Sequence, residues 1–384
     1  MVEWKTLKEL CSDIIVPMRD RPKVFDGHIP WCRIEDIEGM YFNKSLSGLK
    51  VSEDVIKEMN LKVFPIGTVI CSCSATLGVC AINTQPLITN QTFIGLVCGN
   101  EIINRFLFYY MLTRTKEIKT LSTTGTIPYV SRVKFEKLRI PIPSLSEQNR
   151  IVGILDTFTD SIENLKQQIA QRRKQYEFYR DQLLDLEGKE GVEMKTLGES
   201  SILISDGDHQ PPPKSQQGIP FITISNINKD NHKIDFSNTY YVPSDYYESL
   251  KNERKAIEGD VLYTVTGSYG IPVIIDFTDK FCFQRHIAMI RPNIKVLISK
   301  FLYHCLLTRG LKKQADEYAS GGAQKTVSLS SLRKFVIPVP SLSEQQRIVS
   351  ILDTFEASIS NLEAQLAQRQ KQYEYYRNKL LTFE

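Results

Sequence analysis

Hydrophobic residues recur every three or four positions along two long segments of the chain, one in each half. This spacing places them on one narrow face of an α-helix, the seam through which paired helices pack. Each seam is interrupted at the same place by an arginine, Arg172 in the first and Arg369 in the second. The seam residues are Ile151, Leu155, Phe158, Ile162 and Leu165 in the first segment and Ile348, Leu352, Phe355, Ile359 and Leu362 in the second.

The start of each segment carries the signals of a helix N-terminus. Pro141 and Pro143 block a helix before Ser144, and Ser144 with Glu147 has the spacing of a capping box. The second segment repeats these signals from Ser341 onward. We therefore predict two helices of about 40 residues, each roughly 60 Å long.

The second segment belongs to a tandem duplication of the whole chain. Residues 140–187 align with residues 337–384 without a gap, and 33 of these 48 positions are identical. Upstream, "NRFLFYYMLTR" at Asn104 matches "SKFLYHCLLTR" at Ser299, so each half is a divergent region followed by a near-identical tail. The predicted parts are a first domain (1–143), its helix (144–187), a linker (188–194), a second domain (195–340) and its helix (341–384).

Two long matched seams predict that the helices pack on each other as an antiparallel coiled coil. The alternative is that each seam packs on its own globular region. An antiparallel pair would place one domain at each end of the rod, related by a two-fold axis. Duplex DNA suits that symmetry, because its backbone has dyads that dimeric readers exploit.

The divergent regions combine strand-like and helix-like patterns. Residues 69–73 and 261–265 have the pattern of strands, and residues 102–118 and 297–314 are helix-like with one apolar face. The predicted fold class is α+β: two similar mixed α/β domains joined by two long helices that form an antiparallel coiled coil. Turns rich in hydroxyl residues and glycine follow both strands, and their backbone N–H groups could meet phosphate or simply close a hairpin.

Basic and amide side chains are interspersed in the loops of both regions. Arginine, lysine and amides are the groups that base reading and phosphate contact require. The alternative for each of them is a solvated surface side chain. The candidate DNA-binding residues are Arg19, Arg21, Lys23, Arg33, Gln91, Arg105 and Thr124 in the first half and His209, Gln210, Lys214, Thr266, Ser268, Tyr269, Arg285 and Lys325 in the second.

Composition adds few constraints. The net charge of +4 permits an acidic partner without requiring one. The eight cysteines contain no C-x-x-C pair, so we expect reduced thiols and no metal site. No apolar run is long enough to span a bilayer and no signal segment opens the chain, so we expect a cytoplasmic protein without membrane contact.

The search for catalytic motifs is negative. The chain has no P-loop, no G-x-G-x-x-G, no H-E-x-x-H and no G-x-S-x-G, and its five histidines show no triad or metal spacing. We therefore predict a binding protein with no catalytic residues. Two other readings stay open: a coiled-coil scaffold carrying two protein- or glycan-binding modules, and an enzyme with an unfamiliar site.

Two motifs connect the chain to a known family. "IPIPSLSEQNRIVGILD", "IPVPSLSEQQRIVSILD" and "GDVLYTVTGSYG" resemble landmarks of the specificity subunit of type I restriction–modification systems, over the whole chain. The first half departs at Thr68, where the second copy has Asp260, a difference we interpret as drift.

The resemblance implies a function for each part of the chain. Two target-recognition domains would each bind half of a split target in double-stranded DNA, and the two helices would set the gap between the halves. Two modification (methyltransferase) subunits would dock on the conserved regions, with restriction subunits as further partners. The chain itself would need no cofactor, since S-adenosylmethionine, ATP and Mg would belong to the partner subunits.

Overall fold

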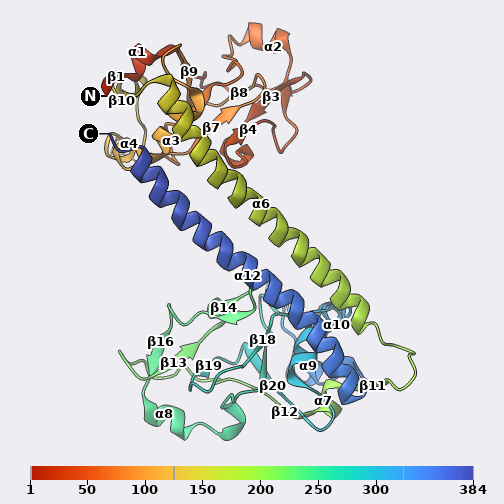
Figure 1. The fold of residues 1–384 in the computed structure, drawn as a ribbon. Helices are drawn as coiled ribbons and strands as arrows, with labels where there is room; N and C mark the ends of the chain where they lie inside the picture. Colours follow the sequence, from red (N-terminus) through yellow and green to blue (C-terminus); the bar gives the residue numbers. More distant parts are fainter. Residues whose placement is uncertain (1, 124–125, 323, 384) are drawn as a thin grey trace. The chain divides into compact units, whose positions relative to one another are not determined.

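The computed structural model describes residues 2–123, 126–322 and 324–383. The chain divides into two compact units, Met1–Lys166 with Ala364–Glu384 and Gln167–Glu363 (Figure 1). The two longest helices, α6 (Leu145–Leu184) and α12 (Leu342–Leu380), each contribute one half to each unit. None of the described helices is long and apolar enough to cross a membrane.

The first unit contains a five-stranded sheet, a three-stranded sheet and a strand pair, together with short helices. The sheet orders are β2-β9-β6-β7-β4, β5-β3-β8 and β1-β10. The elements are β1 (Glu3–Thr6), α1 (Leu7–Leu10), β2 (Cys11–Ile15), β3 (Ile29–Cys32), η1 (Ile34–Asp36), β4 (Tyr41–Phe42), β5 (Lys50–Val51), α2 (Glu53–Glu58), β6 (Val69–Ser72), β7 (Cys80–Asn83), β8 (Ile88–Thr89), β9 (Phe93–Cys98), α3 (Asn104–Thr113), α4 (Thr115–Thr120), α5 (Arg132–Glu136) and β10 (Arg139–Ile142).

The second unit repeats this plan with small differences. Its sheet orders are β12-β20-β17-β18, β16-β13-β19, β14-β15 and β11-β21. The elements are β11 (Glu193–Thr196), α7 (Leu197–Ser200), β12 (Ser201–Asp206), β13 (Ile219–Ile222), η2 (Ile224–Asn226), β14 (Ile227–Asn228), β15 (Lys233–Ile234), β16 (Tyr240–Val242), α8 (Ser244–Ser249), η3 (Asn252–Arg254), β17 (Val261–Thr264), β18 (Pro272–Ile274), β19 (Cys282–Phe283), β20 (Ile287–Pro292), α9 (Ser299–Leu306), α10 (Arg309–Tyr318), α11 (Leu329–Leu332) and β21 (Val336–Val339).

The duplication extends to local irregularities of the backbone. The register of β2 on β9 shifts between Cys11 and Asp13, and that of β12 on β20 shifts between Ser201 and Leu203. The first short helix of each unit begins at a capping box, Thr6 with Glu9 and Thr196 with Glu199. The mixed α/β fold predicted for both halves is confirmed.

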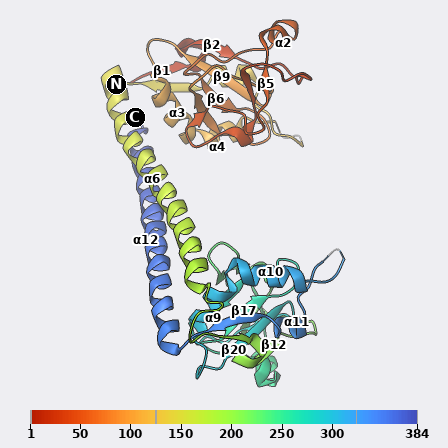
Figure 2. The same ribbon diagram turned by 90° about the vertical axis from the view of Figure 1, so that its right-hand side faces the viewer.

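The long helices pack antiparallel, as predicted. In the second unit Arg173 of α6 pairs with Glu363 of α12 at 2.6 Å, while Tyr179, further along α6, stacks on Phe355, further back on α12. In the first unit Phe158 stacks on Tyr376 in the equivalent way. In both ribbon views the parts of α6 and α12 that belong to one unit lie side by side (Figure 1, Figure 2).

The arginine in each seam has a structural explanation. The guanidinium of Arg172 lies 5.9 Å from the ring centre of Phe355, and that of Arg369 lies 5.7 Å from Phe158. A cation over an aromatic face packs its stem along apolar surface while its charge stays solvated. The interruption of the apolar pattern is therefore compatible with a continuous helix contact.

The first turns of each helix pack on a domain core rather than only on the other helix. Ile151 and Leu155 are buried in the core of the first unit together with Leu381, and Ile348 and Leu352 are buried in the core of the second. The remaining seam residues, Phe158, Ile162 and Leu165 with Phe355, Ile359 and Leu362, are half-buried. The residues of each seam therefore contact both the other long helix and the core of a unit, the two alternatives stated for the sequence.

Three local predictions need correction. The hydroxyl of Ser144 accepts the backbone N–H of Glu147 at 3.2 Å, but the carboxylate of Glu147 binds Arg150 instead of returning to the cap, so the box is half formed. The predicted helix 102–118 is two helices, α3 and α4, that meet at Arg114. The predicted helix 297–314 also breaks, because the hydroxyl of Thr308 accepts the N–H of Leu311 and starts α10.

The departure at Thr68 is a coupled exchange rather than independent drift. In the second unit Asp260 is fully buried and its two carboxylate oxygens accept hydrogen bonds from Arg291, both at 2.8 Å. The strand pairings place Val97 where the second unit has Arg291. Because an unpaired buried charge is strongly destabilising, the two partners must change together.

Candidate nucleic-acid interface

In the second unit the loops that carry most of the candidate residues meet at one edge of the four-stranded sheet. Strand β12 ends at Asp206, β17 ends at Thr264, and β20, which is antiparallel to both, begins at Ile287. These three ends therefore share an edge. We call the residues 206–210, 265–270, 284–286, 320–322 and 324–326 the second loop edge.

Backbone hydrogen bonds hold the loops of this edge together. The N–H of Val265 donates to the carbonyl of His286 at 2.9 Å, and that of Arg285 donates to Asp208 at 3.0 Å. The N–H of Gly267 donates to the carbonyl of Lys325, also at 3.0 Å. Side chains on four loops are thereby fixed on one surface.

The candidate residues of the second loop edge fall into two groups. Arg285 and Lys325 are exposed, and among the described residues no carboxylate lies within ion-pair distance of either. Tyr269 and Thr266 are engaged instead: the Tyr269 hydroxyl donates to Asp316 at 2.9 Å, and Thr266 is 7% exposed. Arginine and lysine are therefore the groups of this edge that are available to an acidic ligand.

Three other candidates lie along the loop that follows β12. His209 pairs with Asp206 at 2.9 Å, and the backbone N–H of Gln210 is held by the Asp208 carboxylate at 3.1 Å. Lys214 follows the proline run and stands 4.9 Å from the ring centre of Tyr240, beside the three-stranded sheet. The first two belong to the second loop edge, and Lys214 is held at a different sheet.

Two further features of the second loop edge bear on recognition. Burial first, and the nearby charge of Arg285 second, lower the pKa of His286 below its ordinary value, so its imidazole is neutral near pH 7 and can both donate and accept. The backbone carbonyl of Ser268 accepts the hydroxyl of Thr264 at 2.8 Å, which ties the turn to the strand. Ser268 thus serves the turn through its backbone.

The first unit has the same edge. Strands β2 and β6 end at Ile15 and Ser72, and the antiparallel β9 begins at Phe93. The N–H of Cys73 donates to Thr92 at 2.7 Å, and the N–H of Val130 donates to Cys73 at 2.8 Å. We call residues 16–28, 73–79, 90–92, 121–123 and 126–130 the first loop edge.

The hydroxyl-rich turns have the same internal tie in both units. The Ser72 hydroxyl accepts the N–H of Val79 at 3.0 Å, as the Thr264 hydroxyl accepts that of Ile271 at 2.9 Å. Ala75 sits where the second unit has Gly267, and both have left-handed backbone, with φ of 59° and 70°. A non-glycine residue there is strained by about 1–2 kcal/mol, so this turn shape is maintained in the first unit at some cost.

An arginine–tryptophan stack marks the first loop edge. The guanidinium of Arg21 lies 5.2 Å from the ring centre of Trp31 and 5.6 Å from that of Phe25, and Arg33 lies 5.3 Å from Trp31. The tryptophan ring thus contacts Arg21 of the first loop edge and Arg33, which follows β3 and also pairs with Glu35 at 3.3 Å. Each cation–π contact contributes about 0.5–1 kcal/mol at an exposed site. Trp31 was missed as a site residue, since its sequence context is that of a strand.

The remaining first-half candidates differ in their surroundings. Arg19, Lys23 and Gln91 are exposed on the first loop edge, and neither Arg19 nor Lys23 has an ion-pair partner among the described residues. Thr124 lies outside the described residues. Arg105 is not brought to the edge: it pairs with Asp156 of α6 at 3.1 Å, next to Asn104, whose amide binds Gly67 before the start of β6.

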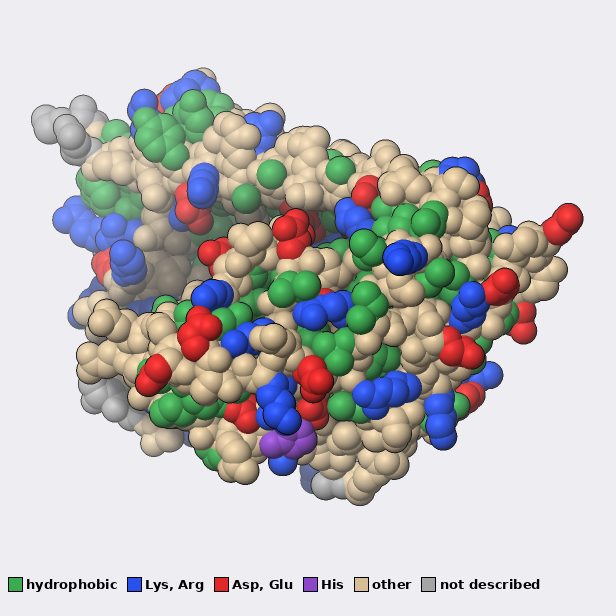
Figure 3. Space-filling view, turned by 90° about the horizontal axis from the view of Figure 1, so that it is seen from below, with side chains coloured by type: hydrophobic (Ala, Val, Ile, Leu, Met, Phe, Trp, Pro, Cys, Tyr) green, Lys and Arg blue, Asp and Glu red, His purple; other side chains and the backbone are tan. Residues whose placement is uncertain are grey.

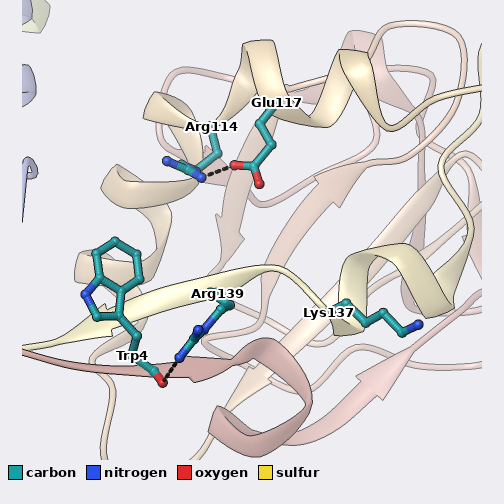
Figure 4. A pocket seen from close by; sticks show the side chains of 5 residues that line it. All are labelled: Trp4, Arg114, Glu117, Lys137 and Arg139. Carbon is teal, nitrogen blue, oxygen red and sulfur yellow. Dashed lines mark hydrogen bonds and ion pairs between the residues drawn. The ribbon is translucent and has the colours of Figure 1, made fainter.

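A separate basic pocket of about 460 Å³ lies beside the β1–β10 strand pair (Figure 4). Its cations are Arg114, Lys137 and Arg139, of which Arg114 pairs with Glu117 and Arg139 donates to the carbonyl of Trp4 at 3.1 Å. Three cations against one carboxylate suit an anionic group.

On the face drawn in Figure 3, Lys and Arg side chains are mixed with acidic and hydrophobic ones. Contacts from individual basic side chains therefore matter more on this face than the electric field of a continuous basic patch.

Comparison with known proteins finds one family over both halves of the chain. The family model described as the type I restriction modification DNA specificity domain matches residues 1–172 and again residues 193–370. The type I restriction enzyme EcoR124I/EcoR124II specificity subunit of Escherichia coli is 30% identical over 303 residues, 74% of this chain and 72% of its own length. The type I restriction enzyme MjaIX specificity subunit of Methanocaldococcus jannaschii is 28% identical over 364 residues, 87% of this chain and 82% of its own.

A solved structure shares the fold. The S subunit of a type I restriction–modification system from M. genitalium matches with a TM-score of 0.59 at 18% identity. The match covers 100% of this chain and 97% of that one. Two mixed α/β units with long helices are thus an arrangement already observed in a known structure.

Proposed function

Because the chain belongs to the type I restriction modification DNA specificity family, it is a specificity subunit, and we propose that each unit reads half of a split DNA target through its loop edge. The observation that carries this proposal is the repetition of one loop edge in two homologous units with different side chains. Two units that share a fold but differ in the side chains of their loop edges are suited to binding two different half-sites.

We assign the exposed arginine, lysine, histidine and glutamine side chains of the two edges to DNA contact. In the first unit these are Arg19, Arg21, Lys23 and Gln91, to which we add the half-buried Arg33 beside the edge. In the second they are His209, Gln210, Arg285 and Lys325. Arginine can bind guanine through two hydrogen bonds and glutamine can bind adenine, while the lysines supply phosphate contacts.

The division of labour along the chain follows from this assignment. Residues 1–143 and 195–340 would be the recognition domains, and residues 144–187 and 341–384, joined through the linker 188–194, would be the helices that set the gap between half-sites. The chain works with DNA and with other subunits of its complex, and catalysis belongs to those subunits.

The finer composition of the complex is an inference from the duplication. Two copies of the "PSLSEQ" segment offer two equivalent docking places, which supports two modification subunits, with restriction subunits as additional partners. S-adenosylmethionine, ATP and Mg would be bound by those partners, and work on DNA would place the chain in the cytoplasm.

Selection from random-sequence duplexes tests the proposal. The chain, assembled with its modification subunit, should enrich a motif in two parts separated by a fixed gap. Replacing Arg285 and Lys325 by alanine should relax one part of the motif only, and replacing Arg19 and Arg21 should relax the other. Binding should weaken steeply with salt, because phosphate contacts release counterions.

A linker variant provides the matched control. Lys189 is exposed and lies in the linker, so Lys189→Ala removes a charge without touching either edge. It should leave both parts of the motif unchanged. A selection that enriches no split motif, or charge variants that weaken both parts equally, would refute the proposal and favour a scaffold that binds protein or glycan.

A further inference from the structure

Ionisable side chains from α6, α9 and α12 (helices labelled in Figure 1) meet within the second unit, where the histidine is buried and the two carboxylates are half-buried. His304 of α9 is fully buried, and its Nε2 atom has no hydrogen-bond partner among the described residues. Its Nδ1 atom lies 3.0 Å from the hydroxyl of Tyr176 on α6, and that hydroxyl lies 3.3 Å from Oε1 of Glu356 on α12. Asp353, one turn before Glu356, completes the cluster.

One placement of the protons satisfies both contacts of Tyr176. If the hydroxyl donates to Glu356, its oxygen can accept the Nδ1–H of His304. The histidine then presents a bare lone pair at Nε2.

That lone pair faces a carboxylate. Nε2 of His304 lies 3.5 Å from Oδ1 of Asp353. With the protons placed in this way, Nε2 and Oδ1 are both acceptors, and a metal cation bound between them would satisfy both.

We propose that Nε2 of His304 and the carboxylates of Asp353 and Glu356 bind a first-row divalent cation, such as Zn²⁺. Nitrogen and carboxylate oxygen are ligands that this class of cation takes. In a tetrahedral zinc site with bonds of about 2.0–2.1 Å, two ligand atoms lie roughly 3.4 Å apart, close to the observed Nε2–Oδ1 separation.

The surroundings suit such a cation. One nitrogen of His304 and one oxygen from each of the two carboxylates lie within 4.8 Å of one another, so a modest movement of the side chains completes the set. Tyr176 acts as the outer partner that fixes the histidine tautomer, as hydrogen-bonded groups do around metal-bound imidazoles. The ammonium of Lys300 lies 2.7 Å from the same Oδ1, and a carboxylate oxygen has two lone pairs, so it can accept from Lys300 and bind the cation as well.

The equivalent positions of the first unit keep only one of the three proposed ligands. Tyr109 occupies the place of His304, and Thr159 that of Glu356, while Asp156 matches Asp353. The Tyr109 hydroxyl donates to Asp156 at 2.7 Å and lies 3.1 Å from the Thr159 hydroxyl, so that cluster is satisfied by hydrogen bonds. The cation site is therefore a property of the second unit, where it links α9 to α12 and, through Tyr176, to α6.

Titration of the metal-free, tag-free chain with Zn²⁺ against a chromophoric chelator tests the site. We expect one tight site per chain, and a rise of the thermal unfolding temperature on addition of Zn²⁺. The double variant His304→Tyr with Glu356→Thr installs the first-unit residues and should weaken binding at least 100-fold. Tyr176→Phe keeps all three ligands and should weaken it about 10–100-fold.

A transplant of the proposed ligands into the first unit tests the same idea through a gain of Zn²⁺ binding rather than a loss of it. Tyr109→His with Thr159→Glu rebuilds the set beside Asp156, and the number of Zn²⁺ bound per chain should rise from one to two. The transplant remains informative if the double variant of the second unit does not fold. A wild-type chain that binds no Zn²⁺ tightly, or binds it as the double variant does, or a transplant without a second site, would overturn the proposal.

Discussion

A glutamine near the start of each long helix holds a loop of its own unit through three hydrogen bonds. The side chain of Gln345 is fully buried. Its Oε1 accepts the N–H of Ile298 at 2.8 Å, and its Nε2 donates to the carbonyls of Val296 at 2.7 Å and Pro340 at 2.9 Å. We predict that Gln345→Leu opens this junction, because leucine fills the space but satisfies none of the three backbone groups.

The magnitude follows from counting those groups. Each buried backbone donor or acceptor left without a partner costs about 1–3 kcal/mol. The extra apolar burial of leucine offsets about 1–2 kcal/mol. The three groups together cost about 3–9 kcal/mol, so the expected net loss is about 1–8 kcal/mol, whose middle value is a large share of the stability of a domain.

Hydrogen exchange followed by mass spectrometry measures this loss locally. Gln345→Leu should speed exchange in peptides covering residues 293–300 and the start of α12, and leave the first unit unchanged. The adjacent Gln346 is exposed, so Gln346→Leu makes the same chemical change without touching the loop. Equal exchange in the two variants would refute the reasoning.

Three further predictions concern the rest of the molecule. Arg291→Val alone should lower the free energy of unfolding of the second unit, measured in urea, by about 3–5 kcal/mol. Adding Asp260→Thr should recover most of that loss, because the pair of residues then matches the first unit. No recovery would contradict the coupled exchange. Hydrogen bonds from Thr196 lower the pKa of Glu199 below its ordinary 4.5, so Glu199 stabilises above that pH and the effect is lost as pH falls through the lowered value. The difference in unfolding midpoint between wild type and Glu199→Gln should therefore vanish in acid, and a difference that grows in acid would contradict it. Seven residues inserted into both α6 and α12 add about 10 Å to each helix. The gap between the two parts of the selected DNA motif should then widen by about three base pairs. An unchanged gap would mean that the helices do not set it.

The parts of the fold that depend on local pattern could be predicted from the sequence. Strands β6 and β17 and the two long helices follow from runs of apolar residues and their spacing. The break at Thr308 could not be predicted, because the apolar face continues across it and the cap depends on backbone geometry. The capping glutamate was assigned wrongly for a similar reason, since Arg150 competes for it one turn later.

The candidate site was predictable as residue types but not as an arrangement. The sequence places His209 and Arg285 in different loops, and only the order β12-β20-β17 brings those loops to one edge. Arg105 looked like a DNA contact because its partner Asp156 lies 51 residues away. His304 gave no metal signal because Asp353 and Glu356 are on another helix.

The near identity of the two tails, beside the divergence of the domains, has an explanation in the packing itself. Tyr176, late in α6, lies against His304 in the second unit, and its equivalent Tyr373, late in α12, lies against Tyr109 in the first. Each tail therefore packs its first half in one unit and its second half in the other. A substitution in either tail must therefore be compatible with packing in both units and with the other long helix. The loop edges meet no such double requirement, so they are free to diverge toward two different half-sites.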